Sequence, residues 1–298
     1  MPRMPDDAAR ADKVYEVDTG GIDAVDAARI DVVERPRSLW RKICSKGSIR
    51  KTFLLAVLAL VWEIYGRQID NELVLPTFLD TMAALGGALA SGELPAAAGY
   101  TIPILLFGYF AGLAIAALLT ALATATRLGA DLLETLTAMF NPLPSIALLP
   151  LALLWFGLGQ GAIVFVLIHA VLWAVALNTF AGFKSVSPTL RMVGQNYGLS
   201  HPAYILRILI PGAFPSILTG LKIGWAFAWR TLIAAELVFG AQGGTGGLGW
   251  FIYERKNQLL IADVFAGLLT VIVFGLVVEN VIFKTVERRT VERWGMSS

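Results

Sequence analysis

Long apolar runs are the feature of this sequence that most constrains its fold. Stretches with enough apolar residues for a membrane span lie near 51–67, 97–125, 131–156, 160–183, 213–240 and 259–284. A bilayer core about 30 Å thick is crossed by a helix of roughly 20 apolar residues, and lipid offers no partner for free backbone groups. We therefore predict an all-α integral membrane protein with six transmembrane helices.

Composition agrees with a lipid-embedded chain and excludes several other classes. Hydrophobic residues make up 56% of the chain and charged residues 15%, against about 25% charged residues in soluble domains. The net charge of +2 provides no basic field for nucleic acid. With one cysteine, Cys44, and two histidines, the chain is poor in zinc ligands, so we expect no metal site and no internal disulfide.

Basic residues predict the orientation, because Lys and Arg in short loops are retained on the cytoplasmic side. They flank the first and last spans at Arg35, Arg37, Arg41, Lys42, Lys46, Arg50, Lys51, Lys284, Arg288, Arg289 and Arg293. Both termini are therefore expected in the cytoplasm, which requires an even number of spans.

The ends of the chain differ from the apolar middle. Residues 1–35 are acidic and have no apolar run, so they are not a signal peptide; we interpret them as a disordered cytoplasmic tail, or alternatively as an accessory contact for a partner. Residues 36–290 form the predicted transmembrane domain, and residues 291–298 a second cytoplasmic tail.

Two segments depart from simple spans. Residues 76–93 are too short to cross a membrane and indicate an interfacial helix that opens at Pro76 and closes at Ser91-Gly92. The third span is broken by Asn141-Pro142-Leu143-Pro144 and again by Pro150, so it should face other helices or a water-filled path. Small residues four apart predict close helix contacts. They are Gly108, Gly112, Gly220 and Gly224.

The connection from Ser187 to Pro211 contains signals for two short helices on the cytoplasmic side. Ser187 before Pro188 starts the first helix and Gly198 ends it, while Ser200 and Pro202 start the second. The result is a helix-turn-helix lying at the membrane surface.

The first of these helices is amphipathic. Leu190, Val193 and Tyr197 fall on one face, and the residues turned away from that face are Arg191, Gln195 and Asn196. Such a helix suits docking into a groove on another protein, although an ordinary interfacial helix has the same pattern.

The spacing in this loop resembles a known signature. Gly198-Leu199-Ser200 is followed by Ile208-Leu209-Ile210-Pro211, with nine residues between Gly198 and Ile208. This resembles the cytoplasmic loop of binding-protein-dependent ABC importer permeases, which reads Glu-Ala-Ala, three residues, Gly, nine residues, Ile-x-Leu-Pro and inserts into the ATPase subunit. The chain departs at the front, where Met192-Val193-Gly194 replace Glu-Ala-Ala and the glutamate is missing.

The resemblance covers nearly all of residues 50–290 and looks like the branch that imports nitrate, bicarbonate, taurine and aliphatic sulfonates. The motifs that carry it are Leu75-Pro76-Thr77, Asn141-Pro142-Leu143-Pro144, Leu154-Trp155-Phe156-Gly157, Gly220-Leu221-Lys222, Ala235-Glu236 and Gly247-Leu248-Gly249-Trp250. It implies a type I importer permease in the bacterial cytoplasmic membrane, paired with a second copy or a related permease. It also implies two cytoplasmic ATPases and an extracytoplasmic solute-binding protein.

Under this resemblance the ATPase coupling surface comprises Leu190, Arg191, Val193, Gln195, Asn196, Tyr197, Gly198, Ser200 and Pro211. The chain has no Gly-Lys dipeptide, so the phosphate loop is absent, and ATP and Mg are expected on the partner ATPase rather than on this chain. We therefore expect a non-catalytic membrane subunit that binds no cofactor.

The glycine-rich segment 244–249 matches the spacing G-x-G-x-x-G, but a membrane span precedes it instead of a strand, so a dinucleotide site is rejected. By the predicted topology it faces outward. We interpret it as a gate-side turn or a contact for the binding protein, made by Gly247, Trp250, Tyr253 and Arg255.

Ionisable groups at membrane depth rarely face lipid, and the fifth span carries Lys222, Arg230 and Glu236. Lys222 is near enough to the cytoplasmic end to snorkel. Arg230 either pairs within the bundle or presents its charge to a passing anion. The predicted substrate path consists of Asn141, His169, Trp173, Asn178, Arg230 and Glu236.

Two rival functions remain open on sequence alone. An ion-gradient-driven secondary transporter would also have broken helices, but it predicts internal inverted repeats, which are not evident. An intramembrane enzyme needs a nucleophile and base or a metal, and His169 and His201 are predicted on different sides of the membrane.

Overall fold

The computed structural model describes residues 47–239, 246–293 and 295 of the 298-residue chain. The predicted acidic tail, residues 1–35, lies outside the described residues. The chain divides into two units, Met1–Val57 and Leu58–Ser298, and each is considered by itself. The described part of the first unit is the start of α2, and the contacts described below lie within the second unit.

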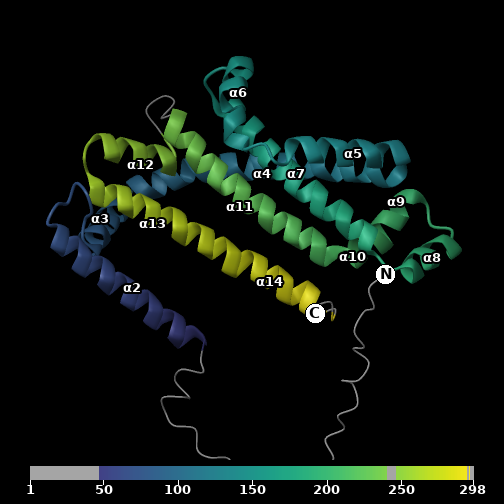
Figure 1. The fold of residues 1–298 in the computed structure, drawn as a ribbon, viewed down its shortest axis with the longest axis horizontal. Helices are drawn as coiled ribbons and strands as arrows, with labels where there is room; N and C mark the ends of the chain where they lie inside the picture. The colour runs from purple at the N-terminus through teal and green to yellow at the C-terminus, as the bar shows by residue number, and fades with distance from the viewer. Residues whose placement is uncertain (1–46, 240–245, 294, 296–298) are drawn as a thin grey trace, which may run out of the picture. The chain divides into compact units, whose positions relative to one another are not determined.

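The described residues form helices and helical turns, with no strand among them (Figure 1). The longer helices are α2 (Gly47–Ile69), α4 (Glu93–Ala125), α7 (Gln160–Ser185), α11 (Phe214–Phe239) and α13 (Ile261–Val277). The shorter helices are α3 (Phe78–Ala90), α5 (Arg127–Phe140), α6 (Leu149–Phe156), α8 (Pro188–Asn196), α9 (His201–Tyr204), α10 (Ile210–Gly212), α12 (Leu248–Asn257) and α14 (Lys284–Glu287). A 3-10 turn (Ser145–Leu148) precedes α6, and π-helical turns cover Ile205–Leu209, Val278–Phe283 and Arg288–Glu292.

Among the described residues, four helices are long and apolar enough to cross a membrane: Ile49–Ile69, Glu93–Ala125, Gln160–Ser185 and Ile261–Glu292. Two further pairs reach that standard only together, Arg127–Phe140 with Ser145–Phe156 and His201–Gly212 with Phe214–Val238. These pairs are bent by 88° and 79° at the break. The structure thus supports four to six spans, and six stays a prediction.

The break predicted in the third apolar stretch is confirmed. The 88° bend falls between Phe140 and Ser145, at the two prolines Pro142 and Pro144. The last helical turn continues to Glu292, so helix extends into the segment 291–298 that we predicted to be a tail.

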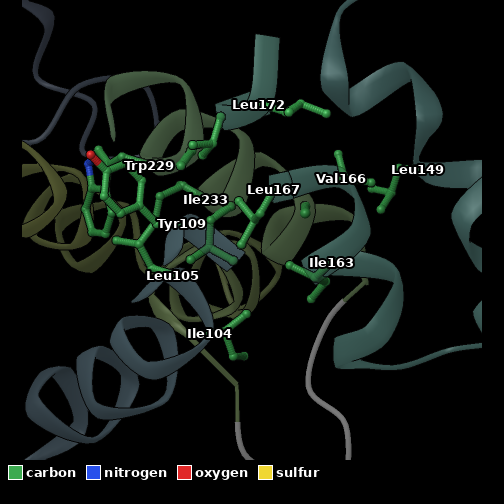
Figure 2. Close-up of a cluster of buried hydrophobic side chains, with 14 of the residues drawn as sticks. Ile104, Leu105, Tyr109, Leu149, Ile163, Val166, Leu167, Leu172, Trp229 and Ile233 are labelled. Atoms are coloured by element: carbon green, nitrogen blue, oxygen red, sulfur yellow. The ribbon is translucent and has the colours of Figure 1, made fainter. Parts of the chain in front are cut away.

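Helix α7 is the most buried of the long helices and packs against both α4 and α11. Leu105 and Tyr109 of α4, Leu167 of α7 and Ile233 of α11 meet in one apolar cluster (Figure 2). Tyr109 also donates a hydrogen bond to the carbonyl oxygen of Leu221 in α11, at 3.0 Å. These contacts join three elements that are far apart in the sequence.

Glycines permit this close packing, as the sequence predicted. A Cβ on Gly108 would lie 2.7 Å from Leu167, and one on Gly112 would lie 2.8 Å from Cβ of Val171. On α11, a Cβ on Gly220 would lie 2.8 Å from Asn178. In lipid, helices associate by such packing rather than by a hydrophobic driving force.

The short helix predicted at residues 76–93 is present as α3. Thr77 caps it by accepting a hydrogen bond from the Asp80 backbone N–H at 3.1 Å. Trp62 of α2 donates from Nε1 to the carbonyl oxygen of Pro76 at 3.0 Å and packs its ring against Phe78 and Phe265. The part of α2 from Leu58 onward is thereby joined to α3 and α13.

Helix α13 lies beside α11 (Figure 1), where the rings of Trp229 and Phe274 pack with centroids 4.7 Å apart. Lys222 was expected to snorkel toward the cytoplasmic end, but its Nζ lies 2.8 Å from Oε2 of Glu287 in α14. Helix α14 is thus held against α11.

We predict that Gly108→Ala destabilises the packing of α4 on α7, because the added methyl group would overlap Leu167. Overpacking of this kind costs about 1–3 kcal/mol. Gly99→Ala on the same helix is the matched control, since a Cβ there meets nothing within 4 Å. Thermal unfolding in detergent should show a lower midpoint for Gly108→Ala only; equal midpoints would contradict the close contact.

Candidate functional site

A cavity of about 330 Å³ lies where the broken helix meets α7 and α11. The break contributes residues 141–146, α7 contributes His169, Ala170 and Trp173, and α11 contributes Phe227, Arg230, Thr231 and Ala234. A volume of a few hundred Å³ is typical of sites for small molecules.

The break shapes one wall of the cavity. Helix α5 ends as the Asn141 backbone N–H donates to the carbonyl oxygen of Thr137 at 3.0 Å, and the chain then turns through the two prolines. Ser145, directly after the turn, lies with its hydroxyl 3.1 Å from Nδ1 of His169. Irregular backbone at membrane depth is tolerated where it is buried in protein or lines a cavity.

Two nitrogen atoms at the cavity wall are buried without a hydrogen-bond partner among the described residues. They are Nε2 of His169 and Nε1 of Trp173. Trp173 is 8% exposed, and its ring stacks on Phe140 with centroids 5.3 Å apart. Buried polar groups are nearly always bonded in native structures. Both atoms are enclosed, so a solute in the open cavity does not reach them in this arrangement of the side chains.

Arg230 supplies the charge at this site. Its Nε donates to the carbonyl oxygen of Ala226 at 3.0 Å, and its guanidinium lies 5.2 Å from the ring centroid of Phe227. Within residues 47–239 and 246–293, no carboxylate forms an ion pair with Arg230. The remaining guanidinium nitrogens are therefore available to an anion.

The structure brings together four of the six residues predicted for the substrate path: Asn141, His169, Trp173 and Arg230. The other two lie elsewhere. Asn178 donates to the carbonyl oxygen of Ala174 at 2.8 Å, and Glu236 is 2% exposed and bonded to Thr101 and Gly249. The sequence placed all six on two helices and a break. The direction in which each residue faces around its helix decides which of them line the cavity.

The predicted pair of short helices between Ser187 and Pro211 is present. The Ser187 hydroxyl accepts from the Leu190 backbone N–H at 3.4 Å and starts α8. Gly198 ends the segment at φ +61°, in the left-handed region that favours glycine. The chain then continues through α9, a π-helical turn and α10 to Gly212, directly before α11.

The apolar face of α8 is exposed. Leu190, Val193 and Tyr197 are 44%, 39% and 80% exposed. Gln195, Asn196, Gly198 and Ser200 are exposed as well. The rest of the predicted coupling surface, Arg191 and Pro211, is only partly exposed.

Arg191 turns back toward the membrane helices. Its Nη2 donates to the carbonyl oxygen of Phe183 at 2.5 Å and its Nε to that of Val186 at 3.1 Å. The Phe183 carbonyl lies in the last turn of α7, where it also accepts from the Val186 N–H at 3.4 Å, and Val186 directly follows the helix. Arg191 therefore anchors α8 to α7, while buried Gly194 lets α8 pack on the ring of Tyr204.

The residues predicted to contact a binding protein lie on or next to α12. Trp250 stacks on Tyr253 with centroids 5.4 Å apart, and Tyr253 is 38% exposed. Gly247 is buried against Glu236, and the Arg255 side chain is only 19% exposed and forms an ion pair with Glu93 of α4. Of this set, Trp250 and Tyr253 offer the accessible surface; residues 240–245 of the glycine-rich segment lie outside the described residues.

Sequence reasoning missed several groups that shape these sites. Ser145 and Phe140 flank the break; Ser145 hydrogen-bonds to His169, and the ring of Phe140 stacks on that of Trp173. Their position next to the prolines of the break could have indicated them. Thr101, the partner of Glu236, gave no such signal. Within the part of the chain that the structure describes, no group of three or more His, Cys, Asp or Glu residues could hold a metal ion.

Comparison with known proteins adds an independent finding. Residues 108–291 match the family described as "Binding-protein-dependent transport system inner membrane component". A putative ABC transporter permease protein of Methanocaldococcus jannaschii is 29% identical over 76% of this chain and 88% of its own length. The taurine transport system permease protein TauC of Escherichia coli is 30% identical over 82% of this chain and 89% of its own. The nitrate import permease protein NrtB of Synechocystis is 28% identical over 80% of this chain and 88% of its own.

Proposed function

Because the chain belongs to the family of binding-protein-dependent transport system inner membrane components, we propose that it forms the translocation path for a small anion. The solute classes that fit are nitrate, bicarbonate, taurine and other sulfonates. Relatives that carry taurine and nitrate in their names support this range.

Family membership itself establishes the coarser assignment. The chain is the permease of an ABC importer, a multi-pass membrane protein without catalytic activity, and separate ATPase subunits hydrolyse ATP. The ion-gradient-driven transporter and the intramembrane enzyme, both open on sequence alone, are set aside by this assignment.

The observation that carries the anion proposal is the unpaired guanidinium of Arg230 at the cavity. The Arg230 side chain is exposed and has no ion-pair partner in the described ranges. A guanidinium can bind two oxygens of a carboxylate, nitrate or sulfonate group in a bidentate manner, which a lysine does not reproduce. The Asn141 side chain adds a neutral polar group to the same wall.

The coupling proposal rests on how the Ser187–Pro211 loop is attached. Arg191 bonds α8 to the end of α7, and α10 leads directly into α11. Both α7 and α11 line the cavity. A displacement of α8 by an ATPase would therefore reach both cavity walls as rigid-body motion, one of the ordinary modes of switching.

The arrangement of partners follows from the same proposal. Two cytoplasmic ATPases would dock on the exposed face of α8, a second copy of this permease would complete the path, and a binding protein would meet the Trp250 and Tyr253 side. Both termini and the Ser187–Pro211 loop would then lie in the cytoplasm, in agreement with the basic residues that flank the spans.

We predict that Arg230→Ala lowers anion uptake about 10- to 100-fold, because hydrogen bonds to charged groups contribute ~1.5–3 kcal/mol. Arg230→Lys should restore uptake only in part, since it keeps the charge and loses the bidentate geometry. Uptake is measured in vesicles with the complete importer, and Arg127→Ala, at an exposed arginine on α5, is the control. Normal uptake in both Arg230 variants at normal expression would end the anion role.

We predict that Gly198→Pro lowers uptake and the stimulation of ATPase activity while the permease still inserts and folds. Proline cannot adopt φ +61° and lacks the N–H that Gly198 donates to Gln195 at 2.9 Å, so the turn between α8 and α9 would be distorted. Reconstituted complexes provide both activities, and the melting temperature of the isolated permease verifies its fold. Retained uptake would refute the coupling role.

A further inference from the structure

Glu236 is an acidic residue at the end of α11 that the cavity does not use. Its side chain is 2% exposed. The Thr101 hydroxyl of α4 lies 2.9 and 3.0 Å from its two oxygens, and the Gly249 backbone N–H of α12 donates to Oε2 at 2.9 Å. The Leu248 backbone N–H in turn donates to the Thr101 hydroxyl at 2.9 Å. Three helices thus meet at one carboxylate.

The glycines before and within α12 are shaped to this carboxylate. A Cβ on Gly247 would overlap the Glu236 carboxylate itself, and one on Gly249 would lie 2.5 Å from the Ile233 carbonyl oxygen and 2.6 Å from Cβ of Glu236. Because neither position accepts a side chain, the start of α12 can lie directly on the carboxylate. The Gly247-Leu248-Gly249 segment, which we predicted to be a gate-side turn or a contact for the binding protein, lies against the Glu236 carboxylate.

The other end of α12 has its own attachment to α4. Arg255, near the end of α12, forms an ion pair with Glu93 at the start of α4. The Arg255 guanidinium also lies 5.2 Å from the ring centroid of Phe251. Helix α12 is therefore fixed at both ends against α4, and through Glu236 it is fixed to α11 as well (Figure 1).

We propose that Glu236 is a positioning residue, not a solute ligand: it latches α12 to α4 and α11 so that the three helices move together at this end of the bundle. The inference rests on the proposed function, because the motion it constrains is the one that opens and closes the path. Glu236 lies six residues beyond Arg230 on the same helix, so the latch transmits movement of the cavity wall to α12.

Burial distinguishes this role from that of a ligand. A passing solute needs access to the group that binds it, whereas the Glu236 carboxylate is enclosed by Thr101 and the start of α12. Removing one partner of a buried hydrogen-bonded group leaves the other partners unsatisfied. We therefore predict that substitutions at Glu236, Thr101 and Gly247 share one effect. Each weakens the attachment of α12 to α4 and α11.

The test uses the complete importer in nanodiscs, with hydrogen exchange of the amides of α12 measured by mass spectrometry beside ATP-dependent uptake. Glu236→Ala should raise the exchange of α12 about tenfold, because local opening follows the loss of a buried bonded network. Uptake should fall in parallel while the KM for solute stays unchanged. Glu236→Gln, which retains an acceptor for the Gly249 N–H, should recover most of both properties.

A double substitution makes the test specific to the contact. Gly247→Ala alone should match Glu236→Ala, since its methyl group displaces the carboxylate. The pair Glu236→Ala with Gly247→Ala should be no worse than either single change, because they break the same contact. Gly99→Ala, two residues from Thr101 with open space around it, is the matched control and should behave as wild type.

Three outcomes would overturn the latch. A raised KM with unchanged exchange of α12 would make Glu236 a solute ligand. Equal loss in Glu236→Gln and Glu236→Ala, with lower melting temperatures in both, would make it a general folding residue. If the effects of Glu236→Ala and Gly247→Ala on the exchange of α12 were additive, the two residues would act independently and not through one contact. The hydrogen exchange of the α12 amides tests the contacts of Glu236, whereas the ATP dependence of wild-type uptake tests the importer assignment. The two measurements can fail separately, so the two failures are distinguishable.

Discussion

The close approach of α4 and α11 to α7 is the constraint on which the other features depend. Gly108, Gly112, Gly220 and Gly224 remove the side chains that would hold the helices apart. Lipid tails are as apolar as leucine, so only dense packing and internal hydrogen bonds favour this arrangement in a membrane. Because α7 and α11 lie so close, His169 and Trp173 come to face the same cavity as Arg230.

The two ends of this packed core are attached to elements suited to receive or transmit force. At one end, Arg191 ties α8 to the last carbonyls of α7, and α10 continues into α11. At the other end of α11, Glu236 bonds to α4 and α12. The cavity lies between these attachments, so under the proposed coupling a displacement of α8 would reach α12 through α7 and α11. Packed cores switch between discrete arrangements rather than deform smoothly, which suits alternating access.

Local features were predictable from the sequence, and long-range partners were not. Capping by Ser187, the turn at Gly198 and the break at Pro142 and Pro144 follow from the backbone preferences of those residues, and the structure contains all three. The pairing of Glu236 with Thr101 joins residues 135 apart, and nothing in the local pattern indicated it. Arg255 illustrates the same limit, because its charge suggested an outer contact while the fold pairs it with Glu93.

The most direct measurement is solute uptake into proteoliposomes that contain the purified permease, with and without its ATPase and binding protein. We predict uptake of a small anion only when the permease, both partners and hydrolysable ATP are present together, because the chain has no phosphate loop of its own. Sustained uptake by the permease alone, driven by an ion gradient, would contradict it.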